Sequence, residues 1–386
     1  INLLKKRKSV LYEKDLEKNL KNNFSRLKFT NNLNDLSNCD NVFISLDVKT
    51  DSKGKSDLTK IKELVRKTLK ILNKKANLVI LCQVPPGFSR QIKWPKNQLY
   101  YQVETLIFGQ AMDRALNPER IIIGSVTKSM KINKKYKYFL NLFRCPIFQM
   151  NYESAELAKI SINMFLISTL TTTNILSEVC EKINANWQDI SNSLKLDKRI
   201  GKYAYLKPGL GISGGNLERD IVTLSNLQNS FKLNSKFLNE IVELSKKRKN
   251  WITIIVNKLI KKYKNPKISV LGLTYKADTH SIKNSPSIQL MNKLKKYKLK
   301  AYDPVIKNIK KTKNIKICKN ISQTIIGCDI LIIATPWKKF EKINYDFLKK
   351  NIRKRIIIDP FALFDSTKLA NKGLIQITMG ENKNVS

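Results

Sequence analysis

The chain has 386 residues, enough for two or three domains with hydrophobic cores of their own, and its hydrophobic content of 42% is ordinary for a globular protein. No uninterrupted apolar run approaches the roughly 20 residues that a transmembrane helix needs, and no cleavable signal peptide is visible, so we expect a cytoplasmic protein without membrane association. The net charge of +43 would suit a nucleic-acid binder, but lysine is spread over every segment and no recognition motif accompanies it, so specific nucleic-acid binding is not expected.

Residues 1–150 alternate short apolar runs with helical stretches. Three runs rich in β-branched residues predict buried parallel strands, namely NVFISL (41–46), NLVILCQV (77–84) and RIIIGS (120–125). Between the first two, residues 57–75 have helical periodicity and a polar outer face. This alternation predicts a doubly wound α/β sheet.

Residues 151–262 lose the strand pattern and become helical. Residues 152–183 form a long amphipathic pattern without proline or glycine. A helix of this length needs more apolar partners than one small domain supplies. We therefore expect it to serve as a spine between domains or as a homodimer interface.

From Pro266 the α/β pattern returns. The predicted strands are KISVLGL (267–273), KLKAYDP (298–304), DILIIAT (329–335) and RIIIDP (355–360), and residues 285–297 read as a helix. VLGLTYK has one glycine and not the GxGxxG fingerprint, so it is weak evidence for a dinucleotide site. The predicted fold class is α/β, with two Rossmann-like doubly wound domains (1–150 and 263–386) joined by a central helical domain (151–262).

Residues 204–220, AYLKPGLGISGGNLERD, combine a glycine-rich stretch with a polar cluster at the start of a predicted helix. Glycine lets the backbone approach a ligand closely because it has no side chain. A glycine-rich turn next to a helix is also common without any ligand, and the composition of the segment does not separate these alternatives.

Histidine and cysteine limit the chemistry that the chain can perform. The single histidine, His280, excludes a histidine-centred triad and a multi-histidine metal site. The six cysteines form no CxxC pair, so we expect neither a metal nor a disulfide framework. Cys82 and Cys328 lie in or beside apolar runs and are interpreted as small hydrophobic residues.

The glycine-rich loop resembles the GFGGSCFPKD signature of the UDP-glucose/GDP-mannose dehydrogenase family, which aligns without a gap with residues 211–220. The catalytic cysteine of the signature falls on Asn216, its lysine on Arg219 and its aspartate on Asp220. Further segments resemble the family in the same order along the chain: 103–124, 154–166, 195–209, 272–286, 301–304 and 333–340.

The resemblance implies a catalytic set of Glu104, Lys159, Asn163, Asn216 and Asp220. Lys159 and Asn163 lie one helical turn apart and so project from one face, and both are suitable donors to an oxyanion. Asp220 could act as a base, directly or through water. Each also has an ordinary structural interpretation: Lys159 as a solvated lysine, Asp220 as a helix-start carboxylate and Glu104 as a solvated edge residue.

The resemblance also implies the ligands and the residues that bind them. A UDP-sugar would contact Arg199, Tyr205, Leu206, Gly211 and Lys276. NAD would contact Gln83, Glu104 and Lys283.

Three departures from the family pattern are visible. Asn216 cannot trap an aldehyde as a thiolate does, because an amide is not nucleophilic. Residues 1–20 resemble the family sequence that normally follows the glycine-rich GxGYVG turn. We therefore expect the first βαβ unit of the NAD-binding domain to be absent. The family's DGRN corresponds to residues 359–362, where an arginine that would help hold the nucleotide is missing.

The sequence therefore predicts an NAD-dependent dehydrogenase that oxidises the C6 hydroxyl of a UDP-sugar, of the UDP-glucose or UDP-N-acetylhexosamine type, toward the uronic acid for polysaccharide precursors. The alternative is a non-catalytic homologue that binds a nucleotide sugar or acts as an assembly partner.

Overall fold

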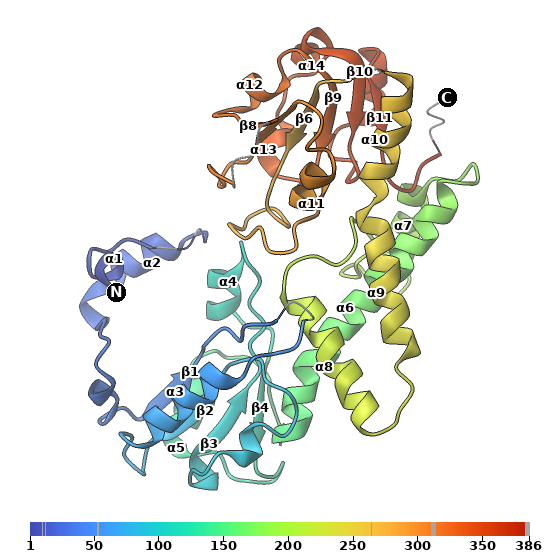
Figure 1. The fold of residues 1–386 in the computed structure, drawn as a ribbon. Helices are drawn as coiled ribbons and strands as arrows, with labels where there is room; N and C mark the ends of the chain where they lie inside the picture. The colour runs from blue at the N-terminus through green and yellow to red at the C-terminus, as the bar shows by residue number, and fades with distance from the viewer. Residues whose placement is uncertain (10, 12, 52–53, 264, 310–313, 383–386) are drawn as a thin grey trace. The chain divides into compact units, whose positions relative to one another are not determined.

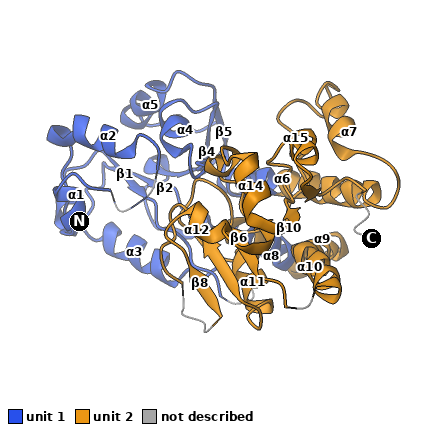
Figure 2. Ribbon diagram, turned by 90° about the horizontal axis from the view of Figure 1, so that it is seen from above, with its two compact units in different colours: residues 1–163, 219–227 blue, residues 164–218, 228–386 orange. Residues whose placement is uncertain are grey.

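The computed structural model describes residues 1–9, 11, 13–51, 54–263, 265–309 and 314–382. The chain forms two compact units, coloured separately in Figure 2. Unit 1 comprises Ile1–Asn163 and Arg219–Leu227, and unit 2 comprises Met164–Glu218 and Gln228–Ser386. Helices α6 (Tyr152–Cys180) and α8 (Asn216–Ser230) each contribute residues to both units.

Unit 1 contains a five-stranded sheet in the order β1-β2-β3-β4-β5. Its strands are β1 (Asn41–Ile44), β2 (Asn77–Ile80), β3 (Leu99–Gln102), β4 (Ile121–Ser125) and β5 (Ile147–Asn151). The three predicted strands are confirmed in position. We expected a parallel sheet, but β4 runs antiparallel to β3, so the sheet is mixed. β3 and β5 were not predicted from the sequence, because LYYQ and IFQMN are not continuous β-branched runs.

The two faces of this sheet are covered by different helices, as Figure 1 shows for α3 and α5. Leu78 and Ile80 of β2 pack with α3 and with the start of α6. Val79 points to the opposite face, where it packs with α5. Apart from its parts of α6 and α8, unit 1 contains the following helices: α1 (Asn2–Lys5), α2 (Leu16–Asn22), η1 (Phe24–Arg26), η2 (Leu33–Leu36), α3 (Thr59–Leu69), η3 (Ser89–Gln91), η4 (Lys96–Gln98), α4 (Ala111–Leu116) and α5 (Lys134–Asn141).

The middle of the chain is helical, as predicted. Besides α6 and α8 it contains α7 (Trp187–Leu194), α9 (Lys236–Lys249) and α10 (Trp251–Lys262). The expected helix over 152–183 is confirmed as α6, but it lacks the polar outer face of an amphipathic helix, since Phe165, Leu176 and Val179 are exposed. By length and composition α6 could cross a bilayer, although the sequence showed no unbroken apolar run; core helices of globular proteins share this property.

The C-terminal part of unit 2 is a six-stranded sheet in the order β11-β10-β9-β6-β7-β8, and every strand pair in it is parallel. Its strands are β6 (Ile268–Leu271), β7 (Leu299–Tyr302), β8 (Ile315–Ile317), β9 (Cys328–Ile333), β10 (Ile352–Ile358) and β11 (Ile375–Ile377). Read from β8, this is the 3-2-1-4-5-6 order of a dinucleotide-binding doubly wound sheet. The four predicted strands are confirmed, whereas the three-residue strands β8 and β11 were missed.

Helices cover both faces of this second sheet. Val270 and Ile332 pack with α10 and α11 (Pro286–Lys293), and Leu331 and Ile333 pack on the other face. The helices of that other face are α12 (Ile321–Ile325), α13 (Lys338–Glu341), α14 (Tyr345–Asn351) and α15 (Ser366–Asn371). The two expected Rossmann-like folds and the helical middle are therefore present.

Candidate active site

A buried polar cluster lies in unit 1 where three elements meet. Gln83 follows β2, Lys159 and Asn163 lie on α6, and Asp220 lies on α8. The carboxyl ends of strands in such sheets are where ligands bind, because loops there can vary without disturbing the core. Four of the residues predicted from the sequence thus belong to this cluster.

Asp220 is the centre of this cluster. Its side chain is 1% exposed. Oδ1 accepts a hydrogen bond from Nε2 of Gln83, and Oδ2 accepts one from Nδ2 of Asn163. Burial raises the pKa of the Asp220 carboxyl above its ordinary value, while the bond from Asn163 and the charge of Arg219 oppose this rise. Asp220 is therefore a carboxylate whose proton affinity its neighbours control, as a general base requires.

Lys159 lies four residues before Asn163 on α6 and is half-buried. Burial lowers the pKa of its ammonium, and the negative charges of Glu104 and Asp220 counteract part of that effect. Among the described residues, none forms a hydrogen bond or an ion pair with this ammonium. The Lys159 ammonium thus interacts electrostatically with Asp220, and its N–H donors are available to a ligand.

Glu104 lies just after β3 and is half-buried. One carboxylate oxygen accepts a hydrogen bond from the backbone N–H of Leu106, which fixes the start of the loop that follows. Glu104 therefore acts on the cluster through its charge on Lys159.

Arg219 also belongs to the cluster, although the sequence did not lead us to predict it as a site residue. It is 4% exposed. Its guanidinium donates to Oε1 of Gln83 at 2.7 Å and to the carbonyl of Val48 at 3.1 Å, and its Nε lies 3.7 Å from Oδ1 of Asp220. The signal that could have identified it was its alignment with the lysine of the family signature.

Cys82 precedes Gln83 but does not supply a nucleophile to the cluster. Its thiol donates to the carbonyl of Ile44 at 3.2 Å and accepts from the N–H of Leu46 at 3.0 Å. Burial raises its pKa to about 11. The thiol is therefore protonated near neutral pH, which confirms its interpretation as a small buried residue.

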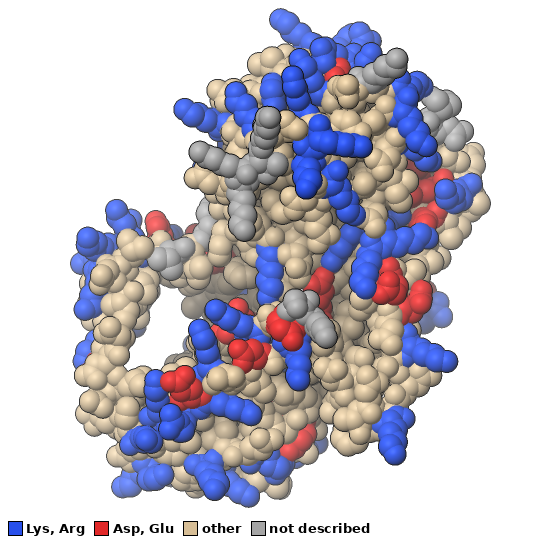
Figure 3. Space-filling view, in the orientation of Figure 1, with Lys and Arg blue, Asp and Glu red and all other residues tan. Residues whose placement is uncertain are grey.

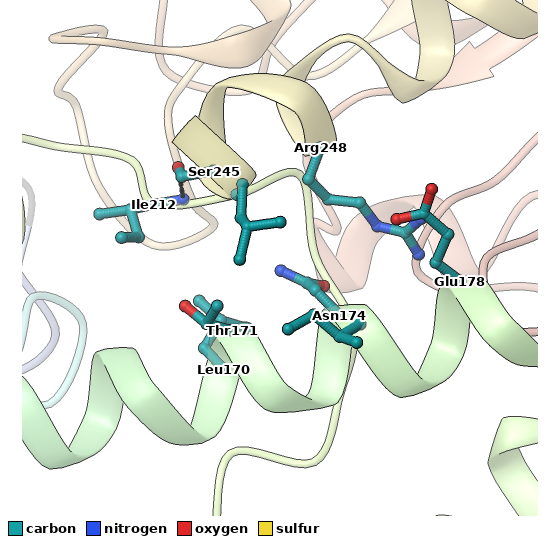
Figure 4. Close-up of a pocket in the computed structure, with 10 residues that line it drawn as sticks. Leu170, Thr171, Asn174, Glu178, Ile212, Ser245 and Arg248 are labelled. Atoms are coloured by element: carbon teal, nitrogen blue, oxygen red, sulfur yellow. Dashed lines mark hydrogen bonds between the residues drawn. The ribbon is translucent and has the colours of Figure 1, made fainter. Parts of the chain in front are cut away.

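In unit 2 the glycine-rich loop before α8 is held by side chains from α6 and α9. The side chain of Asn174 accepts a hydrogen bond from the N–H of Gly209 at 2.9 Å. The side chain of Ser245 accepts one from the N–H of Ile212 at 2.8 Å (Figure 4). Gly211 has φ +71°, and a Cβ there would lie 2.5 Å from the carbonyl of Ser245. The pocket drawn in Figure 4 lies beside this loop and encloses about 20 Å³, room for about one water molecule.

Asn216 is the first residue of α8 and is exposed. Gly215, the residue before Asn216, packs against Lys283. A Cβ added at Gly215 would lie 2.8 Å from the Lys283 ammonium. The following turn is fixed by Glu218, which pairs with Lys249 at 2.7 Å and accepts a hydrogen bond from Asn284. The predicted cofactor residues are thus divided, with Gln83 and Glu104 in unit 1 and Lys283 in unit 2.

The remaining predicted substrate residues lie in unit 2. Arg199 is exposed and paired with Asp197 at 2.6 Å. The backbone carbonyl of Tyr205 accepts a hydrogen bond from the Thr173 hydroxyl at 2.8 Å, and the Tyr205 side chain is exposed. Leu206 is buried with Cys180 and Trp187, which agrees with a structural interpretation of Cys180.

Lys276 is half-buried in the segment after β6, next to the point where the strand order reverses. Gly272 at this point has φ +97°, and an added Cβ would lie 2.4 Å from the Thr335 side chain. Asp303 after β7 accepts from the N–H of Leu273 at 2.7 Å. In doubly wound sheets, ligands bind in the crevice at the carboxyl ends of the strands beside such a switch point.

The described residues of unit 1 fit NAD in part. Lys159 and Asp220 suit the end of the site where a hydride and a proton leave the substrate. The pyrophosphate end lacks such a match, because the N–H groups of Gly87 and Ser89, in the turn after β2, donate to the carboxylate of Glu156. The helix after β1, α3, begins at Thr59 without a side-chain cap.

Lysine and arginine side chains are scattered over the face shown in Figure 3, and acidic side chains are fewer. Blue side chains occur on both units and do not gather over one element. The distribution agrees with the spread of lysine along the sequence.

Comparisons with known proteins cover all parts of the chain. Three family models match in order: "UDP-glucose/GDP-mannose dehydrogenase family, NAD binding domain" at residues 1–141, the central domain at 153–247 and the UDP binding domain at 269–366. A UDP-glucose 6-dehydrogenase from Rickettsia typhi is 31% identical over 98% of this chain and 91% of its own length. One from Bacillus subtilis is 25% identical over 92% of this chain and 80% of its own length.

Two solved structures show the same fold. A UDP-glucose dehydrogenase from Pyrobaculum islandicum has a TM-score of 0.82 at 20% identity, covering 96% of this chain and 88% of that one. A UDP-D-ManNAc dehydrogenase from Pyrococcus horikoshii has a TM-score of 0.84 at 19% identity, covering 98% and 90%. With its fold, its polar cluster and relatives above 30% identity along nearly its whole length, the chain belongs to the UDP-glucose/GDP-mannose dehydrogenase family.

Proposed function

We propose that this protein oxidises the C6 hydroxyl of a UDP-sugar with NAD toward the uronic acid, for polysaccharide precursors. The sugar is of the UDP-glucose or UDP-N-acetylhexosamine type, the two classes named among its relatives. The observation that carries the proposal is the buried Asp220 carboxylate held by Gln83 and Asn163 in the field of Lys159. Every relative named above is a dehydrogenase, which gives no support to the alternative of a non-catalytic homologue.

In the first oxidation Asp220 accepts the proton of the C6 hydroxyl, directly or through one water. NAD, when bound, accepts the hydride from the same carbon. Lys159 donates to the oxygen on which negative charge develops, where an ammonium in a partly buried site is worth more than in water. Asn163 holds Asp220 in place through its amide.

The second oxidation starts from the aldehyde. Asn216 cannot form a thiohemiacetal, so the aldehyde adds water to give a gem-diol. The gem-diol then gives up a hydride, which a second NAD would accept, and a hydroxyl proton, which Asp220 accepts, to leave the carboxylic acid. An exposed amide at the start of α8 can hydrogen-bond a gem-diol hydroxyl.

The proposed binding residues and domains follow the same family frame. Residues 1–150 carry the NAD site, in which Glu104 contacts the cofactor. Residues 263–386 bind the UDP moiety through Lys276, after a central domain at 151–262. Arg199, Tyr205, Leu206 and Gly211 contact the sugar from the segment before α8.

We also propose a cytoplasmic homodimer that pairs through α6, with no specific nucleic acid or membrane as partner. The support is the set of large apolar side chains that α6 exposes. Phe165 is 78% exposed, and Ile175, Leu176 and Val179 are exposed as well. A second copy would remove this apolar surface from water.

The activity is tested by incubating the purified protein with NAD and UDP-glucose, UDP-N-acetylglucosamine or UDP-N-acetylmannosamine in turn, and following NADH absorbance. We expect turnover with one class, lost in Asp220→Asn and reduced at least about 100-fold in Lys159→Ala. Lys182→Ala, on the segment after α6, is the matched control and should keep full activity. Binding of a UDP-sugar without NADH formation in any of the three reactions would favour the non-catalytic alternative.

A further inference from the structure

We propose that Gln83 is a positioning residue that links Arg219 to Asp220 and so keeps the Asp220 carboxylate in its proton-accepting form. The inference rests on the proposed function, in which Asp220 is the base. It differs from the cofactor-contact role expected for Gln83, because both polar atoms of the Gln83 amide are used inside the protein.

The direction of the hydrogen bonds fixes the orientation of this amide. The Arg219 guanidinium has only donors, so the atom of Gln83 that it meets at 2.7 Å is the carbonyl oxygen Oε1. The amino group Nε2 must then face the other way, where it donates to Oδ1 of Asp220. With Arg219 in place, the amide cannot flip and present its oxygen to the carboxylate.

Arg219 is itself fixed. It donates to the carbonyl of Val48 at 3.1 Å, lies 3.8 Å from the carboxylate of Asp47, and is 4% exposed. A planar fork of donors can reach Val48 and Gln83 at once, whereas a lysine ammonium offers a single point charge. Arg219 thus holds one end of a series of hydrogen bonds that links Val48 to Gln83 and Gln83 to Asp220.

The hydrogen bonds that link Val48, Arg219, Gln83 and Asp220 oppose protonation of the Asp220 carboxylate, as the charges around it show. Burial favours the neutral carboxylic acid, and the groups that favour the carboxylate are Asn163, Arg219, Gln83 and Lys159. The charge of Glu104 raises the pKa of Lys159, whereas the charges of Arg219 and Arg114 lower it. Tyr101 of β3 is kept neutral by its burial, which raises its pKa. Removing the Gln83 amino group therefore removes one donor from a carboxylate that burial already disfavours, and Asp220 should hold its proton to higher pH.

Two measurements on the full-length protein test the proposal. The first is the pH profile of kcat, and the second is a ¹³C-carboxyl NMR titration in which the Asp220 signal is assigned by its absence in Asp220→Asn. In Gln83→Met, which keeps the length of the side chain and removes both hydrogen bonds, both midpoints should move up by about one pH unit. KM for NAD should stay within about 2-fold, and kcat should fall about 10-fold on the acid limb.

The matched control is Gln110→Met, because Gln110 is an exposed glutamine of the same unit. It should leave both midpoints unchanged. Arg219→Lys is the second variant: it keeps the positive charge but loses the fork, and it should raise the Asp220 midpoint as well. In the double variant with Gln83→Met the shift should be smaller than the sum of the two, since the residues act in one chain.

An Asp220 midpoint equal to that of the unmodified protein in both Gln83→Met and Arg219→Lys would overturn the proposal. A rise in KM for NAD with unchanged midpoints would instead assign Gln83 to cofactor binding. If the unmodified protein turns over none of the UDP-sugars, the proposed function fails, while the NMR titration still decides the role of Gln83.

Discussion

The amide of Asn163 donates to Oδ2 of Asp220, which lies 57 residues further along the chain. This bond joins α6 to α8 within unit 1 and closes one side of the polar cluster. Because Gln83 closes the other side, the Asp220 carboxylate is enclosed by amide donors and its ionisation depends on them.

The activity should fall as pH falls through the pKa of Asp220. Burial raises this pKa above the ordinary value of 3.8, and the base works only when ionised, so the acid limb of kcat should lie above pH 3.8. The same shift means that the folded state binds the proton more tightly than the unfolded state. The stability contribution of Asp220 is therefore lost as pH rises through the raised pKa.

Asp220→Asn should then abolish turnover without lowering the melting temperature at neutral pH. Thermal unfolding followed by circular dichroism checks this, with the unmodified protein at acidic and neutral pH as reference. A large loss of stability in this variant would show that the carboxylate stabilises the fold.

The second oxidation should proceed without a covalent thioester. The signature cysteine is replaced by Asn216, and Cys82 is a protonated buried thiol. Aldehyde should escape and be trapped by hydroxylamine, and Asn216→Cys should raise acid formation relative to aldehyde. Mass spectrometry that finds the substrate attached to a cysteine of the unmodified protein would contradict this expectation.

NAD should bind weakly to this protein. The N–H groups after β2 that could hold a pyrophosphate are occupied by Glu156. We expect a dissociation constant weaker than micromolar in calorimetric titration. Micromolar or tighter binding would show that a pyrophosphate is held by other groups.

Gly211→Ala should destabilise the protein and Gly209→Ala should not. At Gly211 alanine would need φ +71°, and its Cβ would lie 2.5 Å from the carbonyl of Ser245, so we expect a loss of about 2–4 kcal/mol in the free energy of unfolding. At Gly209 nothing lies within 4 Å of an added Cβ, and the loss should stay within about 0.5 kcal/mol. Urea unfolding midpoints of the two variants make the comparison.

Phe165→Glu should weaken a dimer formed through α6. Phe165 is 78% exposed, and a charge there would have to lose its water in the interface. Sedimentation should show a dimer for the unmodified protein and a larger monomer fraction for the variant. Leu142→Glu, an exposed change outside α6, is the control. A monomeric unmodified protein at high concentration would refute the dimer.

The predictable parts of the fold were those in which neighbouring residues carry the signal. The isoleucine-rich β9 and β10 and the proline-free α6 were found because burial on both faces of a strand, or a long helix, leaves a pattern within one segment. β3 and β11 were missed because a half-polar or three-residue strand acquires its identity from the strands beside it.

The candidate site divides in the same way. The family, the order of the domains and the functional residue types at Lys159, Asn163 and Asp220 could be predicted from the sequence, since the spacing of motifs is preserved along the chain. The contact of Gln83 with Asp220, the burial of Arg219 and the sequestration of the Cys82 thiol became visible in the folded structure. These contacts join residues far apart in the chain, and hydrogen-bond partners and desolvation depend on positions in space that no local pattern encodes.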